Sequence, residues 1–205
     1  MTKVKICGLT RLMDIDIVNL YLPDYVGFVF ASSRRGVTYE EAKILKANLD
    51  KRIQAVGVFV NEPMDNIIRL CNENVIDIVQ LHGDEEEEYI INLQASVKKT
   101  IIKAIRVKSK EYVIREGISS SDYLLLDTYS TDSYGGSGVS FNRDMIPELE
   151  KPCFLAGGLN SNNLIESIRA TTPYCVDISS GVETDGYKDK EKVSEIINMV
   201  RNLKI

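Results

Sequence analysis

The chain has few of the residues that form metal centres or disulfide frameworks. It carries one histidine, His82, and four cysteines that lie far apart without a CxxC pair. Structural zinc sites and disulfide scaffolds both depend on cysteines or histidines at close, repeated spacings. The sequence therefore predicts no metal site and no disulfide framework.

Positive charge and long apolar runs are also scarce. Lysine and arginine number 25 against 30 aspartates and glutamates, with the two signs interspersed, and the formal net charge is −5 at pH 7. No broad positive surface is available for phosphate backbones or anionic membranes. Because the first residues form neither a signal pattern nor a long apolar stretch, we expect a cytoplasmic protein that binds no nucleic acid and no membrane.

The sequence also lacks a Pro-rich linker, a low-complexity tract and an abrupt change of composition. These are the usual marks of a boundary between domains. The 205 residues, 44% of them apolar, suffice for one full core and lie at the short end for an α/β barrel. We therefore expect a single catalytic domain spanning residues 1–205.

Short runs rich in valine, isoleucine and aromatic residues recur roughly every 25 residues, the pattern of successive strand and helix units. There are eight such runs, at 4–7, 25–30, 54–60, 77–81, 100–106, 123–127, 153–156 and 175–179. Amphipathic stretches lie between them. This alternation predicts the α/β class, either a closed (βα)8 TIM barrel or an open, doubly wound sheet.

The stretches between the runs differ in how clearly they predict helices. Residues 193–203 carry apolar side chains at spacings of three and four, which predicts a helix packed on the sheet. Residues 108–121 are polar and 128–142 are rich in Ser, Gly and Tyr, so we expect one of them to be a loop or a single turn. Four glutamates at 85–88 open the fourth helix, where negative charge complements the helix dipole, and we assign them no catalytic role.

The ends of the predicted strands carry most of the unusual residues. In a closed barrel the loops after the strands share one rim, where active sites are built. Cys7, Arg35, His82 and Asp127 all lie at or just after predicted strands. A barrel gathers these residues and an open sheet spreads them out, so we predict a single (βα)8 barrel.

Two loops after the last predicted strands look suited to phosphate. The first contains Gly157 and Gly158, and the second contains Ser179, Ser180 and Gly181. Glycines let backbone amides approach an anion closely, and helix N-termini add N–H groups and a favourable dipole. Either loop alone is also typical of an ordinary turn, but together they occupy the recurrent phosphate site of α/β barrels.

Cys7 and Asp127 are a candidate base and acid. A thiol can pack as a small apolar group or act as a base once ionised. Asp127 follows three leucines at the edge of low dielectric, where its proton affinity should rise, as a general acid requires. A helix cap or a salt-bridged rim residue is the alternative for Asp127. Predicted strands one and six lie three places apart in an eight-strand ring, so the pair can face each other across the mouth.

Three further residues are candidates for substrate binding. Arg35 follows the second strand and can clamp a carboxylate through its planar guanidinium, whereas Arg34 beside it is expected to be solvated. Asp177 either hydrogen-bonds substrate or fixes the loop at Ser179. His82 is expected to hydrogen-bond or pack in a supporting role.

Taken together, these segments resemble the phosphoribosylanthranilate isomerase family of tryptophan biosynthesis almost from end to end. The stretches that carry the resemblance are, in order, KICGLT, VGFVF followed by SSRRGV, VGVFVN, VQLHGDE, LLLDT, GGSGVSF, LAGGLN and VDISSGVETDGYKD. Several are common to barrels, but their order and spacing are specific. Arg34 departs from the pattern, because a proline is common at that position.

The resemblance implies a (βα)8 barrel that performs an Amadori rearrangement of N-(5-phosphoribosyl)anthranilate without metal or organic cofactor. It implies Cys7 as the general base, Asp127 as the general acid and Arg35 as the partner of the anthranilate carboxylate. The two glycine and serine loops would hold the phosphate of this small phosphorylated substrate. A monomer or a homodimer would both be compatible with the sequence.

Two other functions remain open. A related phosphate-binding isomerase of histidine biosynthesis would share the fold and the phosphate loops, but is expected to carry an aspartate where Cys7 stands. A catalytically silent barrel that binds sugar phosphates or a partner protein is the alternative from a different class. The acid and base pair argues against this silent barrel.

Overall fold

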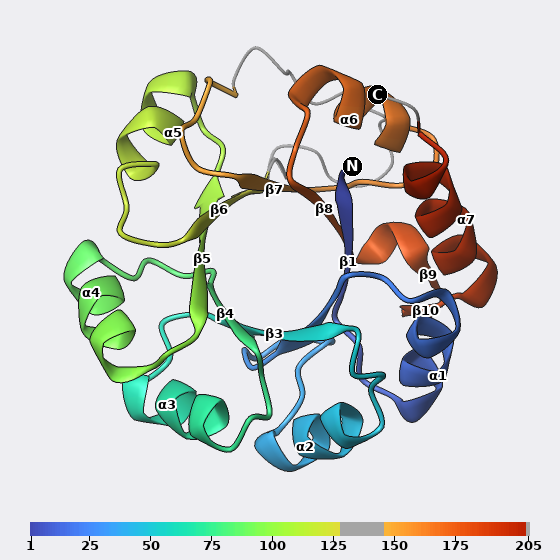
Figure 1. The fold of residues 1–205 in the computed structure, drawn as a ribbon, viewed down its shortest axis with the longest axis horizontal. Helices are drawn as coiled ribbons and strands as arrows, with labels where there is room; N and C mark the ends of the chain where they lie inside the picture. Colours follow the sequence, from blue (N-terminus) through green and yellow to red (C-terminus); the bar gives the residue numbers. More distant parts are fainter. Residues whose placement is uncertain (128–145, 204–205) are drawn as a thin grey trace.

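Eight parallel strands pair in chain order and close into a ring in which β1 contacts both β2 and β8 (Figure 1). This computed structural model describes residues 1–127 and 146–203. The strands are β1 (Lys3–Cys7), β2 (Tyr25–Val29), β3 (Gln54–Phe59), β4 (Ile78–Leu81), β5 (Thr100–Arg106), β6 (Tyr123–Asp127), β7 (Cys153–Ala156) and β8 (Cys175–Ile178). Each starts and ends within one residue of its predicted run. The barrel is therefore confirmed, and the open sheet is excluded.

Helices surround the barrel on the outside (Figure 1). They are α1 (Leu12–Tyr21), α2 (Tyr39–Ala47), α3 (Met64–Asn72), α4 (Glu87–Ser96), α5 (Lys110–Glu116), α6 (Leu164–Thr171) and α7 (Lys190–Arg201). The prediction of a last helix is confirmed by α7, and the polar stretch at 108–121 forms only the short α5. The predicted weak helix at 128–142 lies outside the described residues.

Two apolar layers result from the alternation of side chains along each strand. Val4 and Ile6 on β1 pack with helix residues such as Ile15 and Val193, between the strands and the helices. A second cluster contains strand residues that point into the barrel, among them Tyr25, Val56, Val58, Ile102, Leu125 and Phe154. The barrel interior is thus a packed core, and it lies directly beneath the side chains at the carboxyl ends of the strands.

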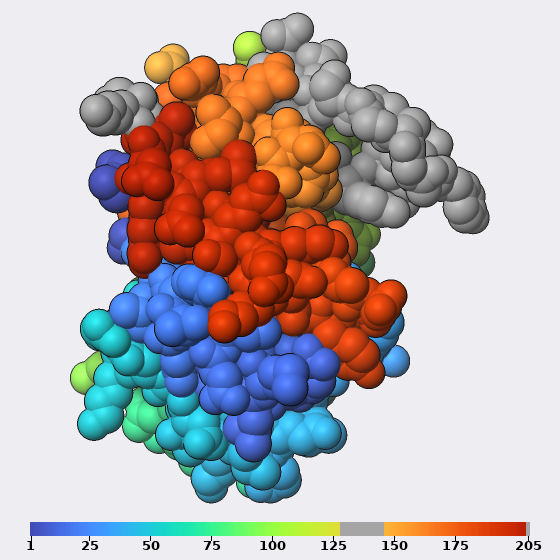
Figure 2. Space-filling model, turned by 90° about the vertical axis from the view of Figure 1, so that its right-hand side faces the viewer, coloured from blue at the N-terminus to red at the C-terminus, as the bar shows by residue number. Residues whose placement is uncertain are grey.

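Closure of the ring brings the two ends of the chain together. The N-terminal helix α1 packs against the C-terminal helix α7, and Figure 2 shows the blue and red segments in contact on one face. After β8 the chain forms the 3₁₀ turn η2 (Ser180–Val182) and the small antiparallel pair β9 (Glu183–Thr184) and β10 (Tyr187–Lys188). In the described part of the chain, no helix is long and apolar enough to cross a membrane.

Candidate active site

The predicted acid and base both lie at the carboxyl ends of barrel strands. Cys7 is the last residue of β1 and Asp127 the last residue of β6. His82 directly follows β4, and the two glycine and serine loops follow β7 and β8. The ring order places β1 and β6 three strands apart, with β8 and β7 between them. The fold therefore brings the predicted residues to one rim.

Cys7 sits in a space that a glycine provides. A Cβ atom on Gly27, its register partner on β2, would lie 2.5 Å from Cys7 Sγ. Burial raises the pKa of the Cys7 thiol, and the ammonium groups of Lys5 and Lys188 act in the opposite direction. Ser179 Oγ donates to the Cys7 carbonyl at 3.0 Å, which ties the loop after β8 to the end of β1.

His82 contacts Asp127 at the mouth of the barrel. The distance from His82 Nε2 to Asp127 Oδ2 is 3.3 Å, and both side chains are 24% exposed, so a bound molecule can reach them. The other ring nitrogen, Nδ1, lies 2.9 Å from Gln80 Nε2. The predicted supporting role for His82 is compatible with this arrangement, because the imidazole is oriented from both sides.

A polar layer that sequence reasoning missed lies beneath Cys7. Lys5 is fully buried, and its Nζ contacts Asp177 Oδ2 at 2.6 Å and Gln80 Oε1 at 2.9 Å. Burial alone would lower the pKa of Lys5, but the Asp177 carboxylate and Cys7 outweigh it and raise the pKa. The signal was present in the period-two alternation of β1, where Val4 and Ile6 face the helices and Lys5 therefore faces the interior.

Asp177 is positioned by its register partner Lys5 on the adjacent strand. Its Oδ2 accepts a hydrogen bond from Lys5 Nζ, whereas the buried Oδ1 has no hydrogen-bond partner among the described residues. A buried acceptor left in this state costs about 1–3 kcal/mol, so a donor from a bound molecule would be favoured there. Both alternatives considered for Asp177, a contact to substrate and support of the neighbouring loop, fit this position.

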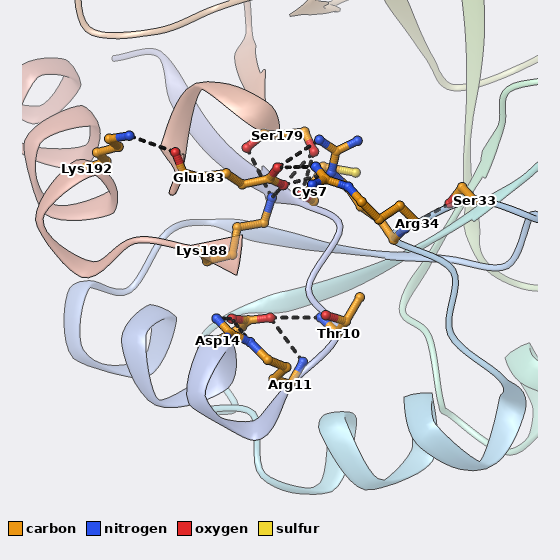
Figure 3. Close-up of polar contacts among 11 residues, drawn as sticks. Cys7, Thr10, Arg11, Asp14, Ser33, Arg34, Ser179, Glu183, Lys188 and Lys192 are labelled. Atoms are coloured by element: carbon orange, nitrogen blue, oxygen red, sulfur yellow. Dashed lines mark hydrogen bonds and ion pairs between the residues drawn. The ribbon is translucent and has the colours of Figure 1, made fainter. Parts of the chain in front are cut away.

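Arg35 is held by Glu183, which the sequence analysis did not identify as part of the site. Its Nε and Nη2 donate to Glu183 Oε1 and Oε2 at 2.7 and 2.8 Å, and Lys188 Nζ contacts Oε1 at 2.7 Å. Figure 3 shows Glu183 between Arg34 and Lys188, close to Cys7 and Ser179. Burial alone would raise the pKa of Glu183, but hydrogen bonds from Arg35 and Lys188 outweigh it and lower the pKa to about 2.

The sequence predicts that Arg34 is solvated, but the structure shows that it also pairs with a carboxylate. Its Nη2 lies 2.9 Å from Glu183 Oε2, although its side chain is 61% exposed. Gly186 leaves room for the Arg34 guanidinium in this position, because a Cβ there would lie 1.9 Å from Arg34 Nη1. An exposed arginine therefore reinforces the carboxylate that orients Arg35.

The two candidate phosphate loops lie against each other. Gly157 and Gly158 have φ angles of +98° and +65°, which L side chains rarely adopt. A Cβ on Gly181 would lie 1.9 Å from the carbonyl oxygen of Leu159, so only glycine lets the loop after β8 pack this closely on the loop after β7. The loop that carries Ser179 and Ser180 is therefore in contact with the loop after β7.

Glu85 differs from the expectation for the acidic run at 85–88. Helix α4 begins at Glu87, and Glu85 lies before it as a buried residue. Its Oε2 is 2.7 Å from Lys103 Nζ on β5, and its carboxylate accepts from the backbone N–H groups of Asn61 and Gly83. The run is therefore split: Glu85 supports the loop that carries His82, and only the later glutamates lie at the helix.

Replacing Glu85 with glutamine should leave Lys103 as a buried cation without its counter-charge. We expect the free energy of unfolding to fall by about 3–5 kcal/mol, measured by urea unfolding. Glu88→Gln, the same change on an exposed residue in the first turn of α4, should change it by less than about 0.5 kcal/mol. Equal effects from the two variants would contradict a stabilising role for the pair.

Fold and site together define a (βα)8-barrel protein whose rim carries a candidate base, a candidate acid and a candidate anion site. Among residues 1–127 and 146–203, no group of three or more His, Cys, Asp or Glu side chains could hold a metal ion. The sequence profile of the N-(5'phosphoribosyl)anthranilate (PRA) isomerase family matches residues 4–199. The chain belongs to this family.

Individual relatives agree with this assignment over their full length. An N-(5'-phosphoribosyl)anthranilate isomerase of Endomicrobium trichonymphae is 49% identical over 203 residues, covering 99% of this chain and 100% of the relative. The crystal structure of phosphoribosyl anthranilate isomerase from Thermotoga maritima has a TM-score of 0.86 at 34% identity, with coverage of 99% and 100%. Another structure of this isomerase holds reduced 1-(O-carboxyphenylamino)-1-deoxyribulose 5-phosphate, with a TM-score of 0.81, 32% identity and coverage of 99% and 100%.

Proposed function

We propose that the protein is a phosphoribosylanthranilate isomerase of tryptophan biosynthesis. It converts N-(5-phosphoribosyl)anthranilate to 1-(2-carboxyphenylamino)-1-deoxyribulose 5-phosphate by general acid–base catalysis. The observation that carries this proposal is the position of Cys7 and Asp127 on one barrel rim, in a chain of this family. The reaction is an isomerisation, so it consumes no second substrate, and its acid–base steps need no cofactor.

Asp127 is the general acid of the first step. It protonates the ring oxygen of the ribose as the bond from that oxygen to C1 breaks, and the nitrogen lone pair forms the C1=N bond of an iminium. A carboxyl group at the barrel mouth suits this step, because a positioned carboxylic acid can transfer its proton to the departing oxygen. The His82 contact fixes the position of the carboxyl group.

Cys7 is the general base of the second step. Its thiolate removes the proton from C2, and the electrons of that bond form C1=C2 while the iminium nitrogen regains its lone pair. The resulting enolamine tautomerises to the ketone. The ammonium groups of Lys5 and Lys188 favour the thiolate, although burial opposes it and the net pKa of Cys7 is raised.

The remaining predicted residues bind the two ends and the middle of the substrate. Arg35 contacts the anthranilate carboxylate with the N–H groups that Glu183 leaves available, since a guanidinium has five donors and Glu183 takes two. Asp177 Oδ1 accepts from a substrate hydroxyl. The loops that contain Gly157 and Gly158, and Ser179, Ser180 and Gly181, hold the phosphate. A relative bound to a product analogue that carries both a carboxyphenyl group and a phosphate supports this division.

Turnover of freshly made phosphoribosylanthranilate tests the proposal directly. The decay of its fluorescence would be followed with excess downstream synthase, which draws off the product. Turnover that disappears in Cys7→Ala supports the isomerase. Binding of the phosphorylated sugar without turnover would favour the silent barrel, and turnover only of the histidine-pathway substrate would favour that related isomerase.

Arg35→Ala should weaken substrate binding more than it slows the chemistry. Loss of a charged hydrogen-bond donor costs about 1.5–3 kcal/mol, which corresponds to a rise in KM of about 10- to 150-fold. Arg34→Ala is the matched control: it removes an exposed neighbour that contacts the same Glu183, and KM should change by less than about 3-fold. Steady-state kinetics decides the result, and an unchanged KM in Arg35→Ala would point to another carboxylate partner.

Other expectations from the sequence stay predictions. They are a cytoplasmic location, assembly as a monomer or a homodimer, a single catalytic domain over residues 1–205, and the absence of nucleic-acid and membrane partners. Size-exclusion chromatography with light scattering would separate the monomer from the dimer.

A further inference from the structure

A continuous chain of polar contacts crosses the barrel from the side of the base to the acid. Asp177 Oδ2 contacts Lys5 Nζ at 2.6 Å, and the same Nζ contacts Gln80 Oε1 at 2.9 Å. Gln80 Nε2 lies 2.9 Å from His82 Nδ1, and His82 Nε2 lies 3.3 Å from Asp127 Oδ2. Each contact needs one donor and one acceptor, so the hydrogens on Lys5 constrain where the hydrogens of Gln80 and His82 lie.

The orientation of the Gln80 amide is set by Lys5. An ammonium group only donates hydrogen bonds, so the atom of Gln80 that faces it must be the carbonyl oxygen. The reversed amide would place its N–H groups against the buried cation. Gln80 is itself buried, so water cannot relieve such a contact. The amide NH₂ group is therefore the one that faces His82.

The Gln80 amide in turn determines the tautomer of His82. Its N–H donates, so the facing Nδ1 must be the nitrogen that accepts. A neutral imidazole with an accepting Nδ1 carries its hydrogen on Nε2. We propose that Lys5 and Gln80 are positioning residues that fix His82 in this Nε2–H tautomer. Its hydrogen is then donated to Asp127.

The fixed tautomer has a consequence for the acid. Asp127 Oδ2 accepts the hydrogen bond from Nε2–H. When Asp127 is protonated, its own proton then resides on Oδ1, because the carbonyl oxygen of a carboxyl group is the better acceptor. With the opposite tautomer the lone pair of Nε2 would face Oδ2, and the acid proton would be drawn toward His82 instead of toward substrate.

The barrel geometry explains why these residues are linked. Lys5 and Cys7 are two residues apart on β1, and Gln80 on β4 is two residues before His82, which directly follows that strand, so the extended backbone points each pair to the same side. Lys5 and Asp177 are register partners on adjacent strands. A fully buried lysine paired with a carboxylate keeps its charge, in agreement with the raised pKa of Lys5. The cation that orients the amide is thus permanent.

The inference rests on the proposed function for its catalytic meaning, but its test does not require turnover. Because the chain has a single histidine, ¹⁵N-histidine labelling gives one pair of ring nitrogens in a long-range ¹H–¹⁵N spectrum. We expect Nε2 at the shift of a protonated nitrogen and Nδ1 at that of an unprotonated one, at neutral pH. A protonated Nδ1, a doubly protonated ring or a mixture of tautomers would overturn the proposal.

Gln80→Glu should move the hydrogen of His82. The glutamate still accepts from Lys5, but it offers an acceptor to Nδ1, so Nδ1 becomes protonated in the spectrum. Loss of one fixed hydrogen bond corresponds to a fall in kcat of about 10-fold, with KM changed by less than about 2-fold. Gln54→Glu, the same change on an exposed residue at the start of β3, should alter neither the spectrum nor kcat.

A second variant keeps the test decisive if Gln80→Glu does not fold. Gln80→Met removes the amide without adding charge, and the spectrum should then show a mixture of both tautomers. A Gln80 variant that loses activity but retains the Nε2–H pattern would overturn the proposal, since its effect would be structural. If the unaltered protein shows the expected tautomer but turns over no phosphoribosylanthranilate, the proposed function fails and the tautomer assignment stands.

Discussion

Cys7→Ala should lower kcat by about 10²- to 10⁴-fold, the usual contribution of a positioned general base. The removed thiol acts mainly on the barrier, so affinity for the product analogue should be largely retained. Stopped-flow or steady-state fluorescence gives kcat, and calorimetry with reduced 1-(O-carboxyphenylamino)-1-deoxyribulose 5-phosphate gives the affinity. Equal loss of both would refute the role of base and indicate that Cys7 shapes the site.

The pH profile distinguishes a base from a packing residue. Burial raises the pKa of Cys7 above its ordinary value, and the base works only as a thiolate, so kcat/KM should rise with pH through the alkaline range. Cys153→Ala is the matched control, because Cys153 begins β7 and lies at the opposite end of the barrel from the rim. It should keep both the rate and the alkaline rise, and a profile for the unaltered enzyme that is flat in this range would contradict the assignment.

The eight strands were predictable because each one is marked by residues that are adjacent in the sequence. Each strand is a short apolar run bounded by polar residues, and eight of them at regular spacing leave few topologies. β5, β6 and β7 begin and end at the predicted residues. The short α5 was harder, because its seven residues include only one buried apolar side chain, Val113, and therefore lack a full amphipathic repeat.

The residues at the strand ends were also predictable, but their partners were not. Cys7 and Asp127 are marked by position, because each ends an apolar run. Glu183 looks in the sequence like any other acidic residue of a loop, and its value to the site depends on Arg35, 148 positions away. Gly27 gave a weak signal, since a glycine inside a strand often marks a close approach of another group.

The buried polar contacts of Lys5 could not be predicted from the sequence either, and the reason is energetic. Lysine is rarely buried, and leaving an unpaired ammonium in a core is prohibitive. Only the fold reveals that Asp177 and Gln80 meet Lys5 in the interior. Distant polar residues thus compensate one another in pairs, and a single sequence does not encode such pairings in any local pattern.

Asp127→Asn is expected to give a folded barrel with kcat lowered by about 10²- to 10⁴-fold, because the amide has no acidic proton to give to the ring oxygen. The change is nearly isosteric, and the amide oxygen can still accept from His82 at the position of Oδ2. The measurement combines the fluorescence assay with circular dichroism and urea unfolding. A large loss of rate with an unchanged midpoint of unfolding supports the general acid.

The same strand provides the control that separates chemistry from structure. Asp122 lies just before the other end of β6, where its Oδ2 accepts from the backbone N–H of Ile101. Asp122→Asn therefore perturbs a barrel aspartate without touching the rim, and kcat should stay within about 2-fold. If Asp127→Asn instead unfolds while Asp122→Asn does not, then Asp127 is a structural residue of the rim. The acid that opens the ribose ring would have to be sought elsewhere.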